Sequence, residues 1–391
     1  MYWTIHLEGG PRRVNHAAVA VGDHIYSFGG YCTGENYRRQ RPIDVHVLNT
    51  VNYRWTAVPI IRPDDPQSCC VPYQRYGHTA VAYGDKIFIW GGRNDEAACN
   101  ILFCFDTKTL RWSCPKVHGA IPGARDGHSA CVIGHSMYIF GGFEEYIDRF
   151  SQDVHALDLE KMEWRYVITQ GNPPSYRDFH SASAIGTRMY IFGGRGDIHG
   201  PYHSQEEVYS NEIVYLETLT STWHCPRTTG YIPLGRRSHS AFVYKNRLYI
   251  FGGYNGICDK HFNDLYCFVP ATNHWIQVKT QGKRPCKRRR QSCCVVGDRV
   301  FLFGGTSPYL GVQPVINEEI SEEMLFEGFD SKLMDHNDLH VLDFAPSLRT
   351  LCLQVVIARH LDENWLPEDI WWDIRAMTTN NNISRPLNNT G

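Results

Sequence analysis

Short apolar segments of strand length recur along the 391-residue chain, and six of them end in a pair of glycines. Tyr26-Ser27-Phe28 precedes the first pair, and Phe301-Leu302-Phe303 precedes the last. The pairs stand at Gly29-Gly30, Gly91-Gly92, Gly141-Gly142, Gly193-Gly194, Gly252-Gly253 and Gly304-Gly305. Their spacing of 50 to 62 residues is too regular for chance and too variable for a fibre. The pattern predicts six copies of one unit built from strands.

Three residue types keep a fixed place in each unit. Thirteen residues before each glycine pair stands a histidine, or a glutamine in the last unit: His16, His78, His128, His180, His239 and Gln291. Three residues before these stands an arginine: Arg13, Arg75, Arg125, Arg177, Arg236 and Arg288. A second apolar register follows each pair, and in five units a tryptophan comes six residues after it: Trp55, Trp112, Trp164, Trp223 and Trp275. The sixth such place holds Arg349.

A repeat of about 50 residues with a glycine pair is typical of the kelch motif, which forms one four-stranded propeller blade. We therefore predict an all-β fold, a six-bladed kelch β-propeller spanning residues 1–343. The missing tryptophan reappears as Trp3, in a segment that reads like the strand beginning at Trp275. Residues 3–8 are thus expected to complete the sixth blade, so that the N-terminal strand closes the ring and leaves no open sheet edge.

The histidines, one in each of five units, raise the alternative of a metal cluster. Each belongs to the first strand of its own blade, so the five imidazole groups are expected to surround the channel without meeting at one point. No metal or other cofactor is predicted. The fourteen cysteines form no C-x-x-C pair, which argues against a zinc site.

Charge and hydropathy limit the class of partner. A net charge of −2 argues against a general nucleic-acid-binding surface, and no direct nucleic-acid partner is expected. No apolar stretch approaches the length of a membrane span, and the first residues lack the basic start and apolar run of a signal peptide. The basic run at 283–290 fits a nuclear import signal or a positive patch at a blade end, and its register favours the patch. We expect a cytoplasmic protein and leave a nuclear fraction open.

After Asp343 the apolar period changes from that of strands to that of a helix. The apolar side chains stand at Leu348, Leu351, Cys352, Val355 and Val356. This spacing places them on one face of an α-helix. A second helix is expected from Pro367, with two acidic residues in its first turn. Residues 344–377 are therefore predicted to be a short helical segment, and residues 378–391 a disordered polar tail.

Two motifs in the helical segment resemble known binding boxes. Ser347-Leu348-x-x-x-Cys352-x-x-x-Val356 resembles the elongin-binding box of ubiquitin-ligase substrate receptors. Leu366-Pro367-x-x-Ile370-x-x-x-Ile374 follows it and resembles the cullin-2 box. In this order, directly after a kelch propeller, they make the chain similar to the family of kelch substrate receptors of cullin-2 ubiquitin ligases. The resemblance implies that elongin B and elongin C bind through Leu348, Cys352 and Val356, and cullin-2 through Leu366, Pro367, Ile370 and Ile374.

The same resemblance implies that the propeller binds substrate C-termini ending in glycine and directs those proteins to ubiquitination and proteasomal degradation. Arginine suits a free carboxylate because its guanidinium donates two parallel hydrogen bonds to it. The residues carried over by motif are the anchors Arg195, Arg237 and Ser238, the aromatic residues Tyr31, Phe143 and Phe150, and the carboxylates Asp126 and Asp178. Of these, Asp126 could pair with a basic penultimate residue, and Asp178 has the equivalent place in the next blade.

Two other classes of function remain open at this stage. A kelch scaffold protein would bind chromatin or actin-associated partners without a ligase. An enzyme on a propeller would need a convergent set of catalytic side chains, which the pattern does not indicate, so a non-catalytic receptor subunit is predicted. The chain ends in Gly391, so its own C-terminus could also enter the pocket of a second copy and give self-association.

Overall fold

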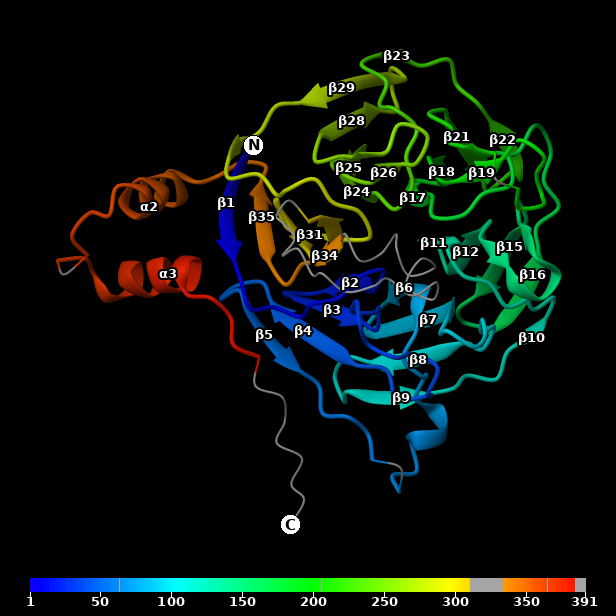
Figure 1. The fold of residues 1–391 in the computed structure, drawn as a ribbon, viewed down its shortest axis with the longest axis horizontal. Coiled ribbons are helices and arrows are strands. Elements are labelled where there is room, and N and C mark those ends of the chain that lie inside the picture. Colours follow the sequence, from blue (N-terminus) through cyan, green and yellow to red (C-terminus); the bar gives the residue numbers. More distant parts are fainter. Residues whose placement is uncertain (63, 205, 310–332, 364, 384–391) are drawn as a thin grey trace, which may run out of the picture.

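The computed structural model describes residues 1–383 except residues 63, 205, 310–332 and 364. Six β-sheets surround a central axis (Figure 1), which confirms the predicted six-bladed propeller. The first strands of the blades contact one another in a closed ring around that axis. Within the described ranges, no helix is long and apolar enough to cross a membrane.

Each blade is an antiparallel sheet of four strands. Blade 1 contains β2 (Ala17–Val21), β3 (His24–Phe28), β4 (Val45–Asn49) and β5 (Arg54–Ala57). Blade 2 contains β6 (Tyr76–Tyr83), β7 (Lys86–Arg93), β8 (Phe103–Asp106) and β9 (Arg111–Ser113). Blade 3 contains β11 (Ser129–Ile133), β12 (Ser136–Phe140), β15 (Val154–Asp158) and β16 (Glu163–Tyr166). Blade 4 contains β17 (Ser181–Ile185), β18 (Arg188–Phe192), β21 (Ile213–Glu217) and β22 (Thr222–His224). Blade 5 contains β24 (Ser240–Tyr244), β25 (Arg247–Phe251), β28 (Leu265–Val269) and β29 (His274–Val278). Blade 6 contains β31 (Ser292–Val296), β32 (Arg299–Phe303), β35 (Leu339–Asp343) and β1 (Tyr2–Leu7).

Shorter elements lie outside the four-stranded pattern. The segments that connect blades add a short parallel strand to the outer edge of the next blade, as β10 (His118–Gly119), β23 (Thr229–Gly230) and β30 (Gln281–Gly282). These strands cover edges that would otherwise be open to pairing. Two-stranded ribbons follow four of the glycine pairs: β13 (Phe143–Glu144) with β14 (Arg149–Phe150), β19 (Gly196–Asp197) with β20 (Glu207–Val208), β26 (Tyr254–Asn255) with β27 (Lys260–His261), and β33 (Thr306–Pro308) with β34 (Leu333–Asp335). Two short 3-10 turns, η1 (Ser68–Cys70) and η2 (Glu145–Ile147), lie in connecting loops.

The N-terminal strand closes the ring, as the sequence predicts. β1 pairs antiparallel with β35, with Trp3 opposite Leu342 and Leu7 opposite Leu339. Thus the first and the last strands of the propeller belong to one sheet (Figure 1).

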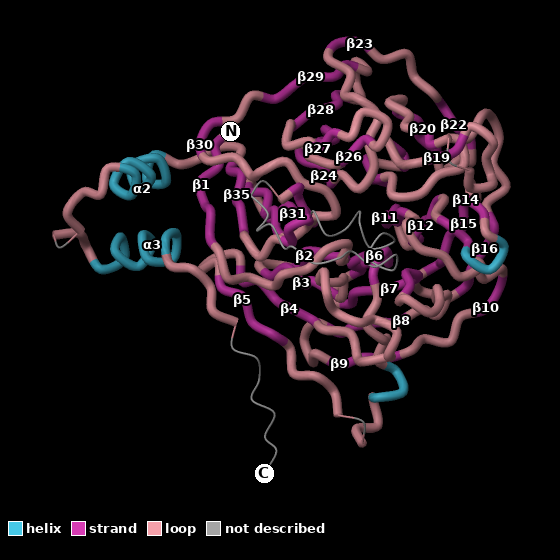
Figure 2. Tube along the Cα trace, viewed as in Figure 1, coloured by secondary structure: helices cyan, strands magenta, loops and turns pink. Residues whose placement is uncertain are grey.

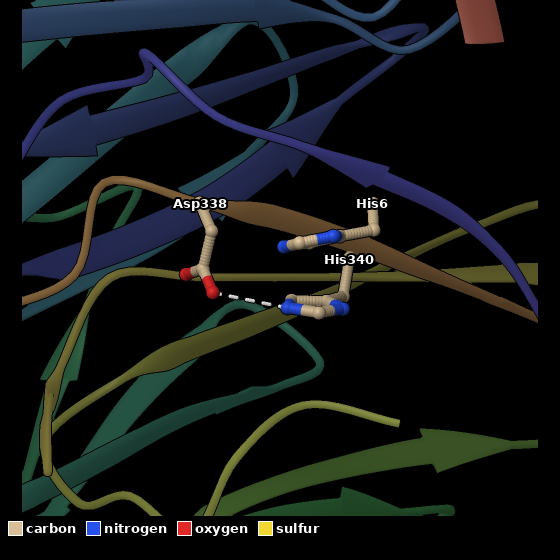
Figure 3. Close-up of side chains that lie close together, drawn as sticks. All are labelled: His6, Asp338 and His340. Atoms are coloured by element: carbon tan, nitrogen blue, oxygen red, sulfur yellow. Dashed lines mark hydrogen bonds and ion pairs between the residues drawn. The ribbon is translucent and has the colours of Figure 1, made fainter. Parts of the chain in front are cut away.

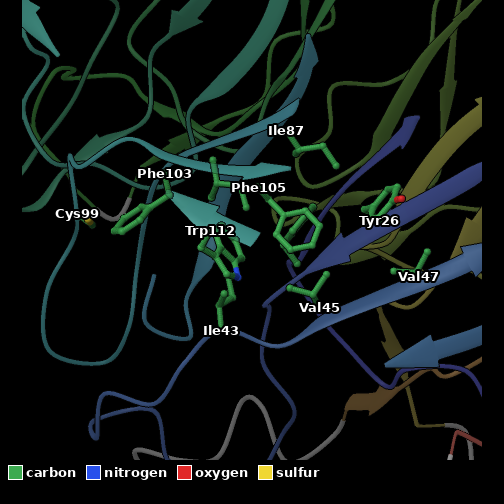
Figure 4. Close-up of a cluster of buried hydrophobic side chains, with 11 residues drawn as sticks. Tyr26, Ile43, Val45, Val47, Ile87, Cys99, Phe103, Phe105 and Trp112 are labelled. Atoms are coloured by element: carbon green, nitrogen blue, oxygen red, sulfur yellow. The ribbon is translucent and has the colours of Figure 1, made fainter. Parts of the chain in front are cut away.

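Aromatic packing joins each blade to the one before it. The outer-strand tryptophan of a blade lies against the residue that precedes the glycine pair of the previous blade. The pairs are Trp55 with Phe303, Trp112 with Phe28, Trp164 with Trp90, Trp223 with Phe140, Trp275 with Phe192, and Trp3 with Phe251. Figure 4 shows one such core, in which Trp112 and Phe105 of blade 2 face Tyr26 and Val45 of blade 1. Trp3 therefore takes the structural place of the tryptophan that the sixth unit lacks.

The repeated glycines and arginines form the hydrogen bonds between blades. The second glycine of each pair donates its N–H to the carbonyl of the register arginine in the next blade, at 2.8–2.9 Å in all six cases. In five blades the side chain of that arginine also donates to the carbonyl of its own blade's first glycine, as Arg177 does to Gly193 at 2.8 Å. These register arginines are structural.

Two helices follow the propeller, as expected. α2 (Leu348–Ala358) begins at Ser347, whose side chain accepts a hydrogen bond from the N–H of Thr350. This is the usual N-cap arrangement. α3 (Glu368–Thr378) carries Glu368 and Asp369 in its first turn. Both helices project from the disc beside β1 (Figure 2), and α3 contacts that strand.

Candidate functional site

A ring of backbone hydrogen bonds surrounds the channel where the first strands begin. In each blade the residue before the register histidine, or before Gln291, has a positive φ. Each of these residues donates its N–H to the carbonyl of the equivalent residue in the preceding blade, at 2.7–3.1 Å. The ring consists of Asn15, Gly77, Gly127, Phe179, Ser238 and Arg290, and Asn15 closes it by donating to Arg290. Together with the register histidines and Gln291, these residues line a cavity of about 120 Å³ on the axis.

Two further positions in each blade stand beside this ring. The residue two before the histidine or Gln291 pairs with the residue after the glycine pair: Val14 with Tyr31, Tyr76 with Arg93, Asp126 with Phe143, Asp178 with Arg195, Arg237 with Tyr254, and Arg289 with Thr306. We call the side chains of these twelve residues and of the ring the channel mouth. The predicted degron-binding residues belong to it, except Phe150, which lies next to it on β14.

One side of the mouth, in blades 3 and 4, is acidic. Asp126 and Asp178 are both buried, at 7% and 1% exposure. Burial, and then the neighbouring Asp178 carboxylate, raise the pKa of Asp126 to about 7, against the opposing charges of Arg93 and Arg195. Burial also raises the pKa of Asp178, although the adjacent Arg195 opposes this shift. Among the described residues, no side chain donates a hydrogen bond to the Asp126 carboxyl.

Arg195 is held by this acidic side. Its Nη2 lies 2.5 Å from Oδ2 of Asp178, and its Nε donates to Oδ1 of the same carboxylate at 3.2 Å. Its Nη1 lies 3.5 Å from Glu207 Oε1. The guanidinium also lies over the ring of Phe150, with Cζ 5.5 Å from the ring centroid. Arg195 lies at the channel mouth, where two carboxylates already compensate its charge.

The adjoining side of the mouth, in blades 5 and 6, is basic. Arg237 and Arg289 lie against one tyrosine, with Cζ atoms 5.6 and 4.5 Å from the ring centroid of Tyr254. Arg290, a member of the ring, lies against Tyr31 and donates a hydrogen bond to its hydroxyl. Ser238 stands between Phe179 and Arg290 in the ring, and its φ is 54°.

Arg237 is among the residues expected from the sequence, whereas Arg289 and Arg290 are not. The run 283–290 is expected to form a patch at a blade end, and Lys283, Arg284 and Lys287 are exposed. Arg288 is buried against Asp338, with two hydrogen bonds of 2.6 Å. The signal was available in the register, because Arg289 stands two residues before Gln291 as Arg237 stands before His239.

Aromatic side chains lie at or beside the mouth on blades 1 to 4. Phe143 and Phe150 lie edge to face with ring centroids 5.3 Å apart. The ring of His203, from the loop between β19 and β20, lies 5.7 Å from that of Phe150. On blades 1 and 2, Tyr31 and Tyr76 lie edge to face at 5.3 Å. The predicted aromatic residues are therefore at or beside the mouth, and Tyr76 and His203 join them.

Two histidines and a carboxylate cluster elsewhere in the fold. His6, Asp338 and His340 have ligand atoms within 4.8 Å of one another (Figure 3). However, both Asp338 oxygens accept hydrogen bonds from Arg288, and Oδ2 also accepts one from His340 at 3.0 Å. The same arginine-carboxylate pair occurs in other blades, as Arg236 with Asp264. Because a fixed cation already occupies the carboxylate, we assign the cluster to blade structure.

The helices present a second candidate surface. α2 is buried on one side through Leu353, and the side chain of Gln354 donates to the carbonyl of Thr4 in β1. The other side of α2 is an apolar stripe of exposed residues: Leu348, Leu351, Cys352 and Val355. We call these four residues the α2 stripe. The predicted elongin contacts Leu348 and Cys352 belong to it, whereas Val356 is half-buried.

α3 is fixed to α2 and to the propeller. Arg349, in the register place of the missing tryptophan, contacts Asp369 at 2.9 Å and Asp373 at 2.7 Å. Of the predicted cullin contacts, Leu366 and Ile370 are half-buried, Pro367 is exposed, and Ile374 is buried at 1% exposure. Ile374 therefore anchors α3 instead of offering a contact surface.

Residues 379–383, which the sequence analysis placed in a disordered tail, lie against the first blade. The Asn381 side chain accepts a hydrogen bond from the N–H of Trp55 at 3.0 Å and donates one to the carbonyl of Tyr53 at 3.1 Å. Arg54 donates to the carbonyl of Thr379. The last part of that tail, including Gly391, lies outside the described residues, and with it the predicted self-association.

Comparisons with known proteins agree with the repeat. A family model described as "KLHDC2/KLHL20/DRC7 Kelch-repeats domain" matches residues 77–305, and a Kelch motif model matches residues 12–60. Kelch domain-containing protein 3 from Rattus norvegicus is 56% identical over 388 residues, which cover 98% of each chain. The protein of the same name from Homo sapiens is 54% identical with the same coverage. Host cell factor 2 from Homo sapiens is 31% identical over 255 residues, which cover 62% of this chain and 32% of the relative.

Proposed function

Because the chain belongs to the kelch-repeat family represented by Kelch domain-containing protein 3, we propose that it is a substrate receptor of a cullin-2 ubiquitin ligase. In this proposal, elongin B and C and cullin-2 bind the two helices, and the channel mouth binds protein C-termini that end in glycine. The matched family models describe kelch repeats and indicate no catalytic family, which agrees with a non-catalytic subunit.

The observation that carries the proposal is the α2 stripe. Leu348 is 78% exposed and Val355 is 48% exposed, although both stand on a helix whose other face is packed on the propeller. A continuous exposed apolar stripe is costly in water and is typical of a surface that a partner covers. The stripe contains the leucine and the cysteine of the motif that resembles the elongin-binding box, which favours elongin C as the partner.

The charge distribution of the mouth supports the second half of the proposal. A peptide terminus carries its negative charge at the last atom, and the basic side with Arg237 and Ser238 suits that carboxylate. The acidic side with Asp126 suits a positive group one or two residues earlier in the peptide. Such a mouth would fix the direction of an entering peptide. A terminal glycine has no side chain to clash with the closely spaced ring.

The ligase connection predicts a clear result for the α2 stripe. The double substitution Leu348→Ala and Cys352→Ala should abolish co-purification of elongin B and C with the full-length chain, because it removes the centre of the apolar contact. Leu361→Ala is the matched control, since Leu361 is also an exposed leucine but lies outside the stripe. Retention of both elongins by the double variant would overturn the ligase proposal and leave a kelch scaffold as the alternative.

The peptide-binding role predicts a loss of affinity on truncation of Arg237. Arg237→Ala should weaken binding of a fluorescein-labelled glycine-ended peptide by roughly 10- to 100-fold, the usual range for a hydrogen bond to a charged group. Fluorescence polarisation measures this directly. The variant should keep the melting temperature of the parent, because Arg237 makes no side-chain hydrogen bond within the described residues. Arg227→Ala, at an exposed arginine between blades 4 and 5, should leave the affinity unchanged.

A further inference from the structure

We propose that the carboxylate anchor of the channel mouth is formed by Arg289 and Arg290 of blade 6 together with Arg237 of blade 5, and that Arg195 is not part of it. This inference rests on the proposed function, because it names the residues that hold the terminal group. We call Arg237, Arg289 and Arg290 the arginine trio.

The backbone brings the trio together. Arg290 donates its N–H to the carbonyl of Ser238 at 2.8 Å, so the ring joins the two blades at this point. Arg237 and Arg289 each stand one residue before a ring member, and both guanidinium groups lie against Tyr254. Three positively charged side chains from two adjacent blades therefore converge on one side of the mouth.

The trio lacks a charge partner in the described part of the chain. The Nε atoms of all three arginines are buried without a hydrogen-bond acceptor. No carboxylate among the described residues lies within ion-pair distance of any of them. By contrast, four of the six register arginines pair with carboxylates of their own blades, and the other two, Arg75 and Arg177, donate to backbone carbonyls. Burial, and then repulsion from Arg290 and Arg237, lower the pKa of Arg289 to about 10.

An uncompensated cluster of this kind is expensive unless it serves a ligand. Buried donors without acceptors and like charges at short range both destabilise the free protein. A carboxylate would accept hydrogen bonds from several guanidinium groups at once and remove both costs. Arg195 differs from the trio, because its guanidinium already donates to Asp178 and lies 3.5 Å from Glu207.

The acidic side of the mouth determines in which direction a bound peptide lies. A carboxylate placed beside Arg195 would also lie beside Asp178 and Asp126, which would repel it. Around Arg289 the nearest charges are the positive ones of Arg290 and Arg237, although Arg237 also acts on the Asp178 carboxylate and opposes the rise of its pKa. The terminal carboxylate therefore belongs to blades 5 and 6, and the residues before it extend toward blades 3 and 4.

Fluorescence polarisation with the full-length chain tests the assignment. The probe is a ten-residue fluorescein-labelled peptide ending in glycine, compared with the same peptide as a C-terminal amide. Arg289→Gln and Arg290→Gln should each weaken binding of the free acid by roughly tenfold or more, because each removes a charged donor. Arg195→Gln should change affinity by less than about threefold. Arg284→Gln, at an exposed arginine of the same basic run, is the matched control and should have no effect.

Thermal unfolding separates a binding role from a structural one. If the trio is uncompensated, Arg289→Gln should leave the melting temperature of the free protein unchanged or raise it, while abolishing the rise that the peptide causes. A lower melting temperature with unchanged peptide affinity would assign Arg289 to structure and overturn the inference. Equal losses of affinity for Arg195→Gln and Arg289→Gln would overturn the exclusion of Arg195.

The result also distinguishes the inference from the function on which it rests. If the parent chain binds the glycine-ended acid and the two blade-6 variants bind it equally well, the proposed function stands and the trio assignment fails. If the parent binds no such peptide, but inorganic phosphate raises its melting temperature and not that of Arg289→Gln, the trio is an anion site and the proposed function fails. If neither probe affects the parent, both are overturned.

Discussion

Lowering the pH from about 7.5 to about 5.5 will cost the propeller at least about 5 kcal/mol of folding free energy. The largest share comes from the register histidines, all of which are buried. Four further histidines, whose pKa burial lowers to about 4, act in the same direction: His155, His261, His336 and His340. Burial, followed by the nearby register arginine, lowers the pKa of His16, His78 and His239 to about 3. The same two causes lower the pKa of His128 and His180 well below the usual value.

The sign follows from which state binds the protons. Below pH 6.5 the histidines of the unfolded chain become protonated. In the folded chain His16, His78 and His239 stay neutral down to about pH 3, and burial keeps the pKa of His128 and His180 well below the usual value. The unfolded state therefore gains protons and stability falls as the pH falls. Each histidine contributes about 1.4 kcal/mol at pH 5.5, or about 7 kcal/mol for the five. Asp126, with its raised pKa, acts in the opposite direction and offsets about 2 kcal/mol.

The sixth blade supplies the variant that tests this cause. Gln291 occupies the histidine position there and donates a hydrogen bond to the carbonyl of Phe251 at 3.2 Å. Neither ring nitrogen of His78 has a hydrogen-bond partner in the described structure, so His78→Gln should fold. Denaturant unfolding at both pH values should show that this variant loses about 1.4 kcal/mol less than the parent on acidification. His135→Gln, on the surface, should behave as the parent does. Equal stability of the parent at the two pH values would contradict the histidine account.

Gly141→Ala is expected to destabilise the propeller by roughly 2–5 kcal/mol, the sum of backbone strain and a steric clash. Gly141 has a φ of +66°, a conformation that an L-residue with a side chain adopts at a cost. A Cβ there would lie 2.8 Å from the carbonyl oxygen of Arg177 and 2.8 Å from Cε1 of His180. That carbonyl accepts the hydrogen bond from Gly142 that joins blade 3 to blade 4, so it cannot move without weakening the junction.

A second glycine in the same blade separates the two costs. Gly134 has a φ of +61°, but a Cβ there would meet nothing within 4 Å. Gly134→Ala should therefore show the strain alone, about 1–2 kcal/mol. Denaturant unfolding of both variants measures the difference, which is the cost of crowding the junction between the blades. If the two substitutions cost the same, the close approach of the blades at the glycine pairs would not be needed for stability.

The propeller could be predicted almost completely from the sequence because each blade repeats the same physical contacts. A tryptophan must fill the gap between neighbouring sheets, so its absence after Asp343 and its presence at Trp3 were enough to predict the closing strand. A glycine pair must admit the next blade's arginine carbonyl, so the pairs marked every junction. The tryptophan and the glycine pair are needed in every blade, so each recurs along the chain and can be recognised from a single sequence.

The mouth was harder to predict because its residues differ from blade to blade. Arg195 follows a glycine pair and Arg237 stands two residues before a register histidine. Only the structure reveals that Asp178 and Glu207 compensate the charge of Arg195. Arg289 was hidden in a basic run whose members point in different directions. Ile374 fits the helical motif, yet contacts with the body of the protein bury it. These outcomes depend on packing between distant segments, which periodicity alone does not encode.

The closure of the ring by β1 has a consequence for synthesis. This strand is made before the other strands of the propeller, and its partner β35 is made more than 300 residues later. At ordinary elongation rates the strand waits roughly 20–70 s before it can pair. α2 and α3 follow β35 directly and rest on β1, so they gain their support only after both ends of the propeller have met. A nascent chain that stops before β35 can therefore neither complete the ring nor present the α2 stripe on a closed propeller.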